Sequence, residues 1–102
     1  MNNTLQNKNI DIILPNYNSA PHIKETLDSI ISQSFRNWKL FIIDDNSNIE
    51  TKNILKKYEN HPNINILWLN KNKKAGFCRN LGLRISKSDY IAFIDSDDIW
   101  EN

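Results

Sequence analysis

Three short polar clusters contain most of the residues that could do chemistry. They read PNYN at 15–18, DDNS at 44–47 and DSDD at 95–98, and each directly follows an apolar segment. The five carboxylates of these clusters would repel one another at close range unless a cation or hydrogen-bond donors offset their charge. Oxygen ligands without His or Cys suit Mg²⁺ or Mn²⁺, which typically bind through one or two protein carboxylates plus substrate phosphates. The clusters therefore predict a divalent-metal site for a phosphate-bearing ligand.

The phosphates of such a ligand would have to be held without a glycine-rich loop. Gly76 and Gly82 are the only glycines in the chain, so neither a GxGxxG motif nor a P-loop can be written. We expect the metal, Arg79 and the pair at 73–74 (Lys-Lys) to neutralise a diphosphate instead.

Several of these residues also have a structural interpretation. Asp44 could close a turn at the end of a strand, Tyr17 could pack within its loop, and Asp45 is better placed for a ligand. We interpret Cys78 as a buried apolar helix residue. The carboxylates at 95–98 (DSDD) favour a metal or nucleotide site, because charge is rarely concentrated in this way directly after an apolar strand.

Two kinds of apolar segment alternate along the chain and must position the clusters. Short, nearly continuous, β-branched segments at 10–15, 40–44, 64–69 and 90–95 predict four buried parallel strands. Apolar residues at helical spacing lie between them, which predicts a helix after each of the first three strands.

The helix ends can be predicted from capping residues. Ser19 is expected to cap the first helix, and Ser47 with Glu50 predicts a capping box that opens the second. The third helix is expected at about 76–85, with Phe77 on its apolar face together with Leu81 and Ile85.

This element order predicts an α/β fold with a Rossmann-like, doubly wound and mostly parallel sheet. Crossovers between parallel strands are right-handed, and we expect the strand order 3-2-1-4. Ligands of such sheets bind outside the carboxyl ends of the strands. All three polar clusters are therefore expected at one sheet edge.

The length and the charge of the chain limit the kinds of protein that it could be. The chain has 102 residues, with 13 Lys and Arg against 12 Asp and Glu, so its balanced charge gives no general attraction for nucleic acid. We divide it into a polar tail at 1–9 and one domain at 10–102, which we expect to be truncated at its C-terminus. A single cysteine and the lack of a long apolar run predict a cytoplasmic protein, peripheral to the inner face of the membrane in full-length form.

Four segments, in order, resemble the signatures of family 2 glycosyltransferases. ILPNYN at 13–18 is similar to the family's IPTYN, FIIDDNS at 41–47 to its VVDDGS, GFCRNLGL at 76–83 to its ARNxGL segment, and YIAFIDSDD at 90–98 to its DxD region. Asn46 replaces the family's glycine and can still adopt a left-handed turn. The chain thus resembles the N-terminal, nucleotide-sugar-binding half of a GT-A fold.

The resemblance implies a role for each site residue. Pro15 and Tyr17 would line the nucleobase pocket, and Asp45 would hydrogen-bond the base, usually uracil. Arg79 would approach the base or the diphosphate. Asp95 and Asp97 would hold the ribose and a metal-bound water, and Asp97 or Asp98 would bind the Mn²⁺ or Mg²⁺ ion directly.

The resemblance also implies the reaction. Family members usually transfer a sugar, with inversion, from a nucleotide-diphosphate donor to an acceptor hydroxyl that an Asp or Glu deprotonates. We expect a UDP-sugar donor and a glycan or lipid-linked acceptor in surface polysaccharide synthesis. The general base is expected beyond Asn102, so the 102 residues alone should bind the donor without transferring it, and should self-associate.

Two alternatives stay open from the sequence. One is a nucleotide-binding module without turnover. The other is a phosphatase of the haloacid-dehalogenase type, in which Asp95 would be the nucleophile, although that motif usually follows the first strand.

Overall fold

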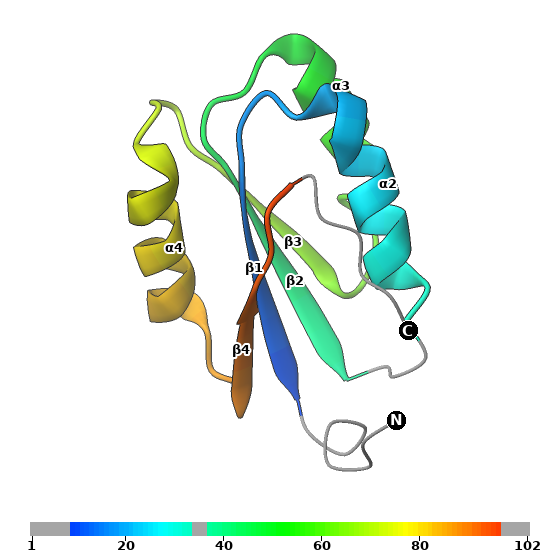
Figure 1. The fold of residues 1–102 in the computed structure, drawn as a ribbon, viewed down its shortest axis with the longest axis vertical. Helices are drawn as coiled ribbons and strands as arrows, with labels where there is room; N and C mark the ends of the chain where they lie inside the picture. The colour runs from blue at the N-terminus through cyan, green and yellow to red at the C-terminus, as the bar shows by residue number, and fades with distance from the viewer. Residues whose placement is uncertain (1–8, 34–36, 97–102) are drawn as a thin grey trace.

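The structure is a computed structural model that describes residues 9–33 and 37–96 of the chain. Strands and helices alternate from one end to the other (Figure 1). The strands are β1 (Ile10–Asn16), β2 (Trp38–Asp44), β3 (Ile64–Trp68) and β4 (Tyr90–Phe93). The helices are α2 (Ala20–Ile31), α3 (Ile49–Lys56) and α4 (Lys74–Ile85). The predicted alternation is confirmed.

All four strands lie parallel in one sheet, in the order β3-β2-β1-β4. This confirms the predicted fold class and strand order. The chain builds the sheet outward from β1 to β3 and then returns to place β4 on the other side of β1. Such a reversal opens a crevice at the carboxyl ends of the two strands that flank it, which is where ligands of open α/β sheets bind.

Helices cover both faces of the sheet, with α2 and α3 on one side and α4 on the other (Figure 1). Successive side chains of a strand point to opposite faces. Ile12 and Leu14 of β1 accordingly pack in the larger core with α2 and α3, while Ile13 packs in a smaller core with Cys78 of α4. Among the described residues, no helix is both long and apolar enough to cross a membrane.

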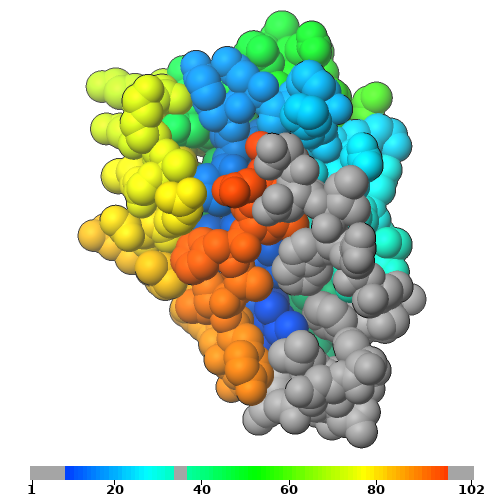
Figure 2. Space-filling view, in the orientation of Figure 1, coloured from blue at the N-terminus to red at the C-terminus, as the bar shows by residue number. Residues whose placement is uncertain are grey.

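β4 is not buried, and β3 is buried only at Ile64, so our prediction of four buried strands is wrong for these two strands. Tyr90, Ile91 and Phe93 are 40%, 40% and 46% exposed, and β4 (orange) lies open at the surface in Figure 2. In the described part of the chain, β1 is the only strand that pairs with β4. The apolar sequence of β4 therefore predicts the strand correctly but does not predict its burial.

The helix starts differ in detail from the predicted ones. Ser19 occupies the N-cap position of α2, but its hydroxyl donates a hydrogen bond to Oδ1 of Asn16 instead of capping the helix. The capping box of Ser47 and Glu50 is wrong, because Asn48 is the N-cap of α3 and accepts a hydrogen bond from the N–H of Thr51 at 3.0 Å. Ser47 instead hydrogen-bonds the carboxylate of Asp44 in the turn after β2.

Small residues form the fully buried side of α4. The predicted apolar face is wrong at Phe77, whereas Leu81 packs against the smaller core as predicted. Phe77 is 47% exposed, whereas Cys78 and Gly82, one helical turn apart, are buried. A Cβ atom on Gly82 would lie 2.3 Å from Cγ2 of Ile13, so α4 can approach β1 this closely only with glycine at position 82. The prediction failed because it weighed side-chain size and not the closeness of helix to sheet.

Candidate functional site

Three loops with unusual backbone meet at the carboxyl edge of the sheet. Asn18, Asn46 and Lys74 have φ angles of 48°, 60° and 74°, and they lie after β1, β2 and β3 respectively. Asn tolerates this left-handed region better than most residues, whereas Lys does not, so Lys74 stores strain at the start of α4. Every left-handed residue in the described part of the chain therefore lies at the edge that the sequence predicts to bind a ligand.

The turn after β2 is built around the carboxylate of Asp44. This fully buried group accepts hydrogen bonds from Nδ2 of Asn16 at 3.1 Å and from the backbone N–H and hydroxyl of Ser47 at 3.1 and 2.6 Å. Asp44 therefore has the turn-forming role, and donors of the protein offset its charge.

The loops after β1 and β2 are also joined directly. The N–H of Asn18 donates to the hydroxyl of Ser47 at 3.0 Å, and the N–H of Asn48 donates to Oδ1 of Asn18 at 2.7 Å. These contacts fix the loop that carries Tyr17 against the loop that carries Asp45. The sequence did not predict these bonds between the two loops.

Asp45 binds the start of α4. Its carboxylate is 3% exposed and accepts the backbone N–H of Lys73 at 2.6 Å and of Lys74 at 2.8 Å. A carboxylate in this position satisfies orphan donors of the helix and interacts favourably with the positive end of its dipole. Each oxygen accepts one of these two N–H groups, and the carboxylate also has a hydrogen bond with the Cys78 thiol. Because an ionised carboxylate offers about four acceptor positions, Asp45 can still accept a donor from a ligand.

A small pocket lies between the first two loops and the start of α4. Its volume is about 70 Å³, and Pro15, Tyr17 and Asp45 line it together with Asn16, Ala75 and Cys78. Three residues that the sequence predicted to bind a donor thus share one hollow. Tyr17 is 52% exposed at its rim, so its ring is free to cover a bound group. Ala75 and Cys78 were not predicted to line it.

Cys78 is fully buried at the base of this pocket. Burial, together with the nearby carboxylates of Asp45 and Asp44, raises the pKa of its thiol to about 11. The thiol is therefore protonated at neutral pH. The burial of Cys78 on α4 confirms its interpretation as a buried apolar helix residue.

Arg79 and Asp95 meet across the gap between α4 and the end of β4. Nη2 of Arg79 lies 4.0 Å from Oδ1 of Asp95, and the two side chains are 46% and 71% exposed. A pair this exposed contributes at most about 1 kcal/mol and can exchange its partner for a ligand at little cost. The charge of Arg79 lowers the pKa of the Cys78 thiol against the larger effects that raise it, and Cys78 lines the pocket, so the guanidinium lies near the pocket.

The structure shows fewer contacts for the other residues that were predicted to bind the diphosphate or the metal. Nζ of Lys73 lies 5.7 Å from the centre of the Phe77 ring, where it is attracted to the aromatic face. Asp97 and Asp98 lie outside the described residues. Within residues 9–33 and 37–96, no group of three or more His, Cys, Asp or Glu side chains could hold a metal ion. The exposed carboxylate of Asp95 suits a hard cation by its chemistry.

A larger cavity of about 280 Å³ lies at the opposite, amino end of the strands. It is lined by Asn9, Ile10, Asn37, Trp38, Lys39, Asn63 and Ser88. None of the predicted site residues contributes to it, and ligands of parallel α/β sheets bind at the other edge. The candidate site is therefore the smaller pocket with its neighbouring ion pair.

Comparison with known sequences gives one family. The sequence model described as glycosyl transferase family 2 matches residues 11–102. TuaG of Bacillus subtilis (strain 168), named as a teichuronic acid biosynthesis glycosyltransferase, is 37% identical over 93 residues, which cover 90% of this chain and 37% of TuaG. This chain therefore spans little more than a third of that relative.

Comparison with solved structures gives the same fold. The crystal structure of Staphylococcus aureus TarS 1–349 in complex with UDP-GlcNAc matches with a TM-score of 0.82 and 33% identity, over 89% of this chain and 27% of that one. The mannosyltransferase PcManGT from Pyrobaculum calidifontis, in complex with GDP-Man and Mn²⁺, matches with a TM-score of 0.83 over 93% of this chain and 29% of that one. At 24% identity, the second likeness concerns the fold alone.

Proposed function

This chain belongs to glycosyl transferase family 2, and we propose that its described domain binds the nucleotide-diphosphate sugar, a UDP-sugar, together with Mn²⁺ or Mg²⁺. The whole protein would transfer that sugar, with inversion, to a hydroxyl of a glycan or lipid-linked acceptor in surface polysaccharide synthesis. One observation carries the proposal. Pro15, Tyr17 and Asp45 line a single pocket at the carboxyl edge, beside the exposed pair of Arg79 and Asp95.

The base would lie in the pocket between Pro15 and Tyr17. Uracil presents an N–H donor at N3, and an ionised carboxylate can only accept hydrogen bonds. Asp45 keeps acceptor capacity beyond its bonds to Lys73 and Lys74, so it is suited to bind this N–H. Cytosine has no donor at the same ring position, which supports uridine over cytidine nucleotides.

The diphosphate would lie over Arg79 and the acidic cluster. We assign Asp95 and Asp97 to the ribose and the metal-bound water, and Asp97 or Asp98 to the direct binding of the metal. A bound divalent ion would neutralise the negative charge that develops on the leaving diphosphate. Arg79 would move from the exposed carboxylate of Asp95 toward a phosphate oxygen, an exchange that its weak ion pair permits.

The described residues form the donor pocket, so we assign donor binding to this chain. A phosphatase with Asp95 as nucleophile has less support. Asp95 follows the edge strand β4, and the family match over residues 11–102 is to glycosyltransferases.

Calorimetric titration of the 102-residue chain with UDP, CDP, GDP and ADP tests the proposal. Each nucleotide is titrated in Mn²⁺ and again in excess chelator. We expect UDP to bind most tightly, and only with the metal present. Equal affinity for UDP in Mn²⁺ and in chelator would contradict the metal role, and a preference for CDP would contradict the role of Asp45.

A further inference from the structure

The chain after β4 carries the acidic cluster but receives little support from its own strand. β4 has four residues, pairs only with β1 in the described part of the chain, and leaves Tyr90, Ile91 and Phe93 exposed. An edge strand with so little buried surface does not fix the chain that follows it. Another element must therefore position this segment.

Two of the three residues that follow the strand are anchored to different elements. Ile94 is 3% exposed, packs in the larger core, and donates its N–H to the carbonyl of Ile13 at 3.1 Å. The carbonyl of Ser96 accepts a hydrogen bond of 2.7 Å from Oγ1 of Thr26. Asp95 lies between these two anchors with its carboxylate exposed toward Arg79.

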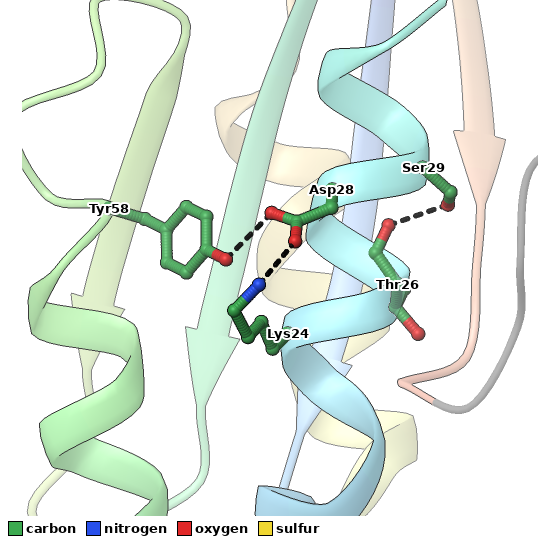
Figure 3. A network of polar contacts seen from close by, with 5 residues as sticks. All are labelled: Lys24, Thr26, Asp28, Ser29 and Tyr58. Carbon is green, nitrogen blue, oxygen red and sulfur yellow. Dashed lines mark hydrogen bonds and ion pairs between the residues drawn. The ribbon is translucent and has the colours of Figure 1, made fainter.

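The bond from Thr26 is unusual for a threonine within a helix. Such a hydroxyl commonly donates to a carbonyl three or four residues earlier in its own helix. Thr26 is 1% exposed, and its hydroxyl instead reaches a residue 70 positions away in the sequence. In Figure 3 the side chain of Asp28 points from α2 toward Tyr58, whereas that of Thr26 points away from it.

We propose that Thr26 is a positioning residue, which holds the Ser96 peptide and thereby sets the direction in which the carboxylate of the neighbouring Asp95 meets the donor and its metal. This role rests on the proposed function of the acidic cluster. It assigns to α2, which contributes no residue to the pocket, a part in metal-dependent binding.

Two substitutions separate the hydrogen bond from the packing of the side chain. Thr26→Val keeps the branched shape and removes the donor, whereas Thr26→Ser keeps the donor and removes the methyl group. Ser29→Ala is the matched control, because its hydroxyl donates to the carbonyl of Thr26 at 2.7 Å on the same helix. Each variant of the 102-residue chain is titrated with UDP over a range of Mn²⁺ concentrations.

We expect Thr26→Val to require about fivefold more Mn²⁺ for half-maximal UDP binding, which corresponds to one hydrogen bond of ordinary strength. Thr26→Ser and Ser29→Ala should stay within twofold of the unchanged chain. Amide hydrogen exchange gives an independent readout, in which the N–H of Ile94 should exchange faster in Thr26→Val and at the original rate in Thr26→Ser.

The outcomes are distinguishable. If the unchanged chain binds UDP with Mn²⁺ and Thr26→Val has the same Mn²⁺ requirement, the positioning role is wrong and the proposed function stands. A change of equal size in Thr26→Ser would overturn the role as well, because packing and not the donor would then be responsible. If the unchanged chain shows no metal-dependent binding, the proposed function fails, and the role of Thr26 in it fails with it.

Discussion

Asp44 and Asp45 are neighbours in the chain, yet their carboxylates serve different elements. Asp44 closes its own turn through Ser47, whereas Asp45 accepts the first N–H groups of a helix 28 residues further along. The sequence favoured Asp45 over Asp44 as the ligand residue, and Asp45 alone of the two lines the pocket. Its bonds to Lys73 and Lys74 could not be predicted, because no pattern in the local sequence links the loop after β2 to the start of α4.

Substitution of Asp45 should separate its two roles. Asp45→Ala removes both acceptors at the start of α4, and we expect it to lower the free energy of unfolding by about 0.5–2 kcal/mol and to abolish UDP binding. Asp45→Asn keeps one acceptor for the helix but presents an N–H₂ group to the N–H of uracil. It should recover much of the stability and little of the affinity, as urea denaturation and UDP titration in Mn²⁺ would measure. Full affinity in Asp45→Asn would contradict the assignment to the base.

The four strands could be predicted because short β-branched segments alternate along the chain with segments whose apolar residues have helical spacing. Their order could be predicted because right-handed crossovers between parallel strands leave few possible topologies. The buried faces of the helices and the burial of each strand could not be predicted, because both depend on which elements pack against them. Gly82 has no side chain to enter an apolar pattern, and yet it determines how closely α4 packs on β1. Asp11 carried an overlooked signal, since a charged residue within an apolar strand must find partners.

The packing of α4 on β1 can be tested with its two glycines. Gly82→Ala would place Cβ 2.3 Å from Cγ2 of the buried, β-branched Ile13, and we expect it to destabilise the chain by about 1–3 kcal/mol despite the better helix propensity of Ala. Gly76→Ala is the control, because its Cβ meets nothing within 4 Å. It should be neutral or stabilise by up to about 1 kcal/mol in urea denaturation. Equal effects of the two substitutions would show that α4 does not pack this closely.

The carboxylate of Asp11 joins β1 to the turn before β4. It accepts hydrogen bonds from the hydroxyls of Ser88 and Ser86 at 2.6 and 2.7 Å, and from the N–H of Lys87 at 3.0 Å. Burial raises the pKa of Asp11, but the hydrogen bonds from Ser88, Ser86 and the backbone outweigh it and hold the pKa below its ordinary value of 3.8. The partners lie about 75 residues away, which is why the sequence did not identify them.

Stability should depend on the ionisation of Asp11. Because its pKa is lower in the folded state, its contribution is present above pH 3.8 and is lost as the pH falls through the folded value. We expect Asp11→Asn to lower the free energy of unfolding by about 1–3 kcal/mol at pH 7, and by less as the pH falls below about 4. The control is Asp89→Asn, which removes an exposed carboxylate near the same turn. A difference between the unchanged chain and Asp11→Asn that is independent of pH would contradict this account.

At the scale of the whole molecule, the edge strand β4 leaves three large apolar side chains exposed. An apolar edge strand is a template for pairing with another chain. We expect the 102-residue chain to self-associate at rising concentration, as sedimentation would measure, and Ile91→Lys to reduce this association. Ile49→Lys, on α3, removes an equally apolar side chain that is 67% exposed and should have no such effect. A monomer at all concentrations, or equal effects of the two substitutions, would contradict the prediction.

The central claim is that nucleotide and metal bind one site together, and thermal unfolding of the 102-residue chain tests it most directly. The chain is melted alone, with Mn²⁺, with UDP, and with both. Ligands that bind only the folded state, at ~100 times their dissociation constant, stabilise it by about 2.7 kcal/mol, which for a domain of this size raises Tm by roughly 10 °C or more. We predict this rise for UDP with Mn²⁺ and little change for either alone. Shifts that merely add, or no shift with both, would contradict the proposed donor site.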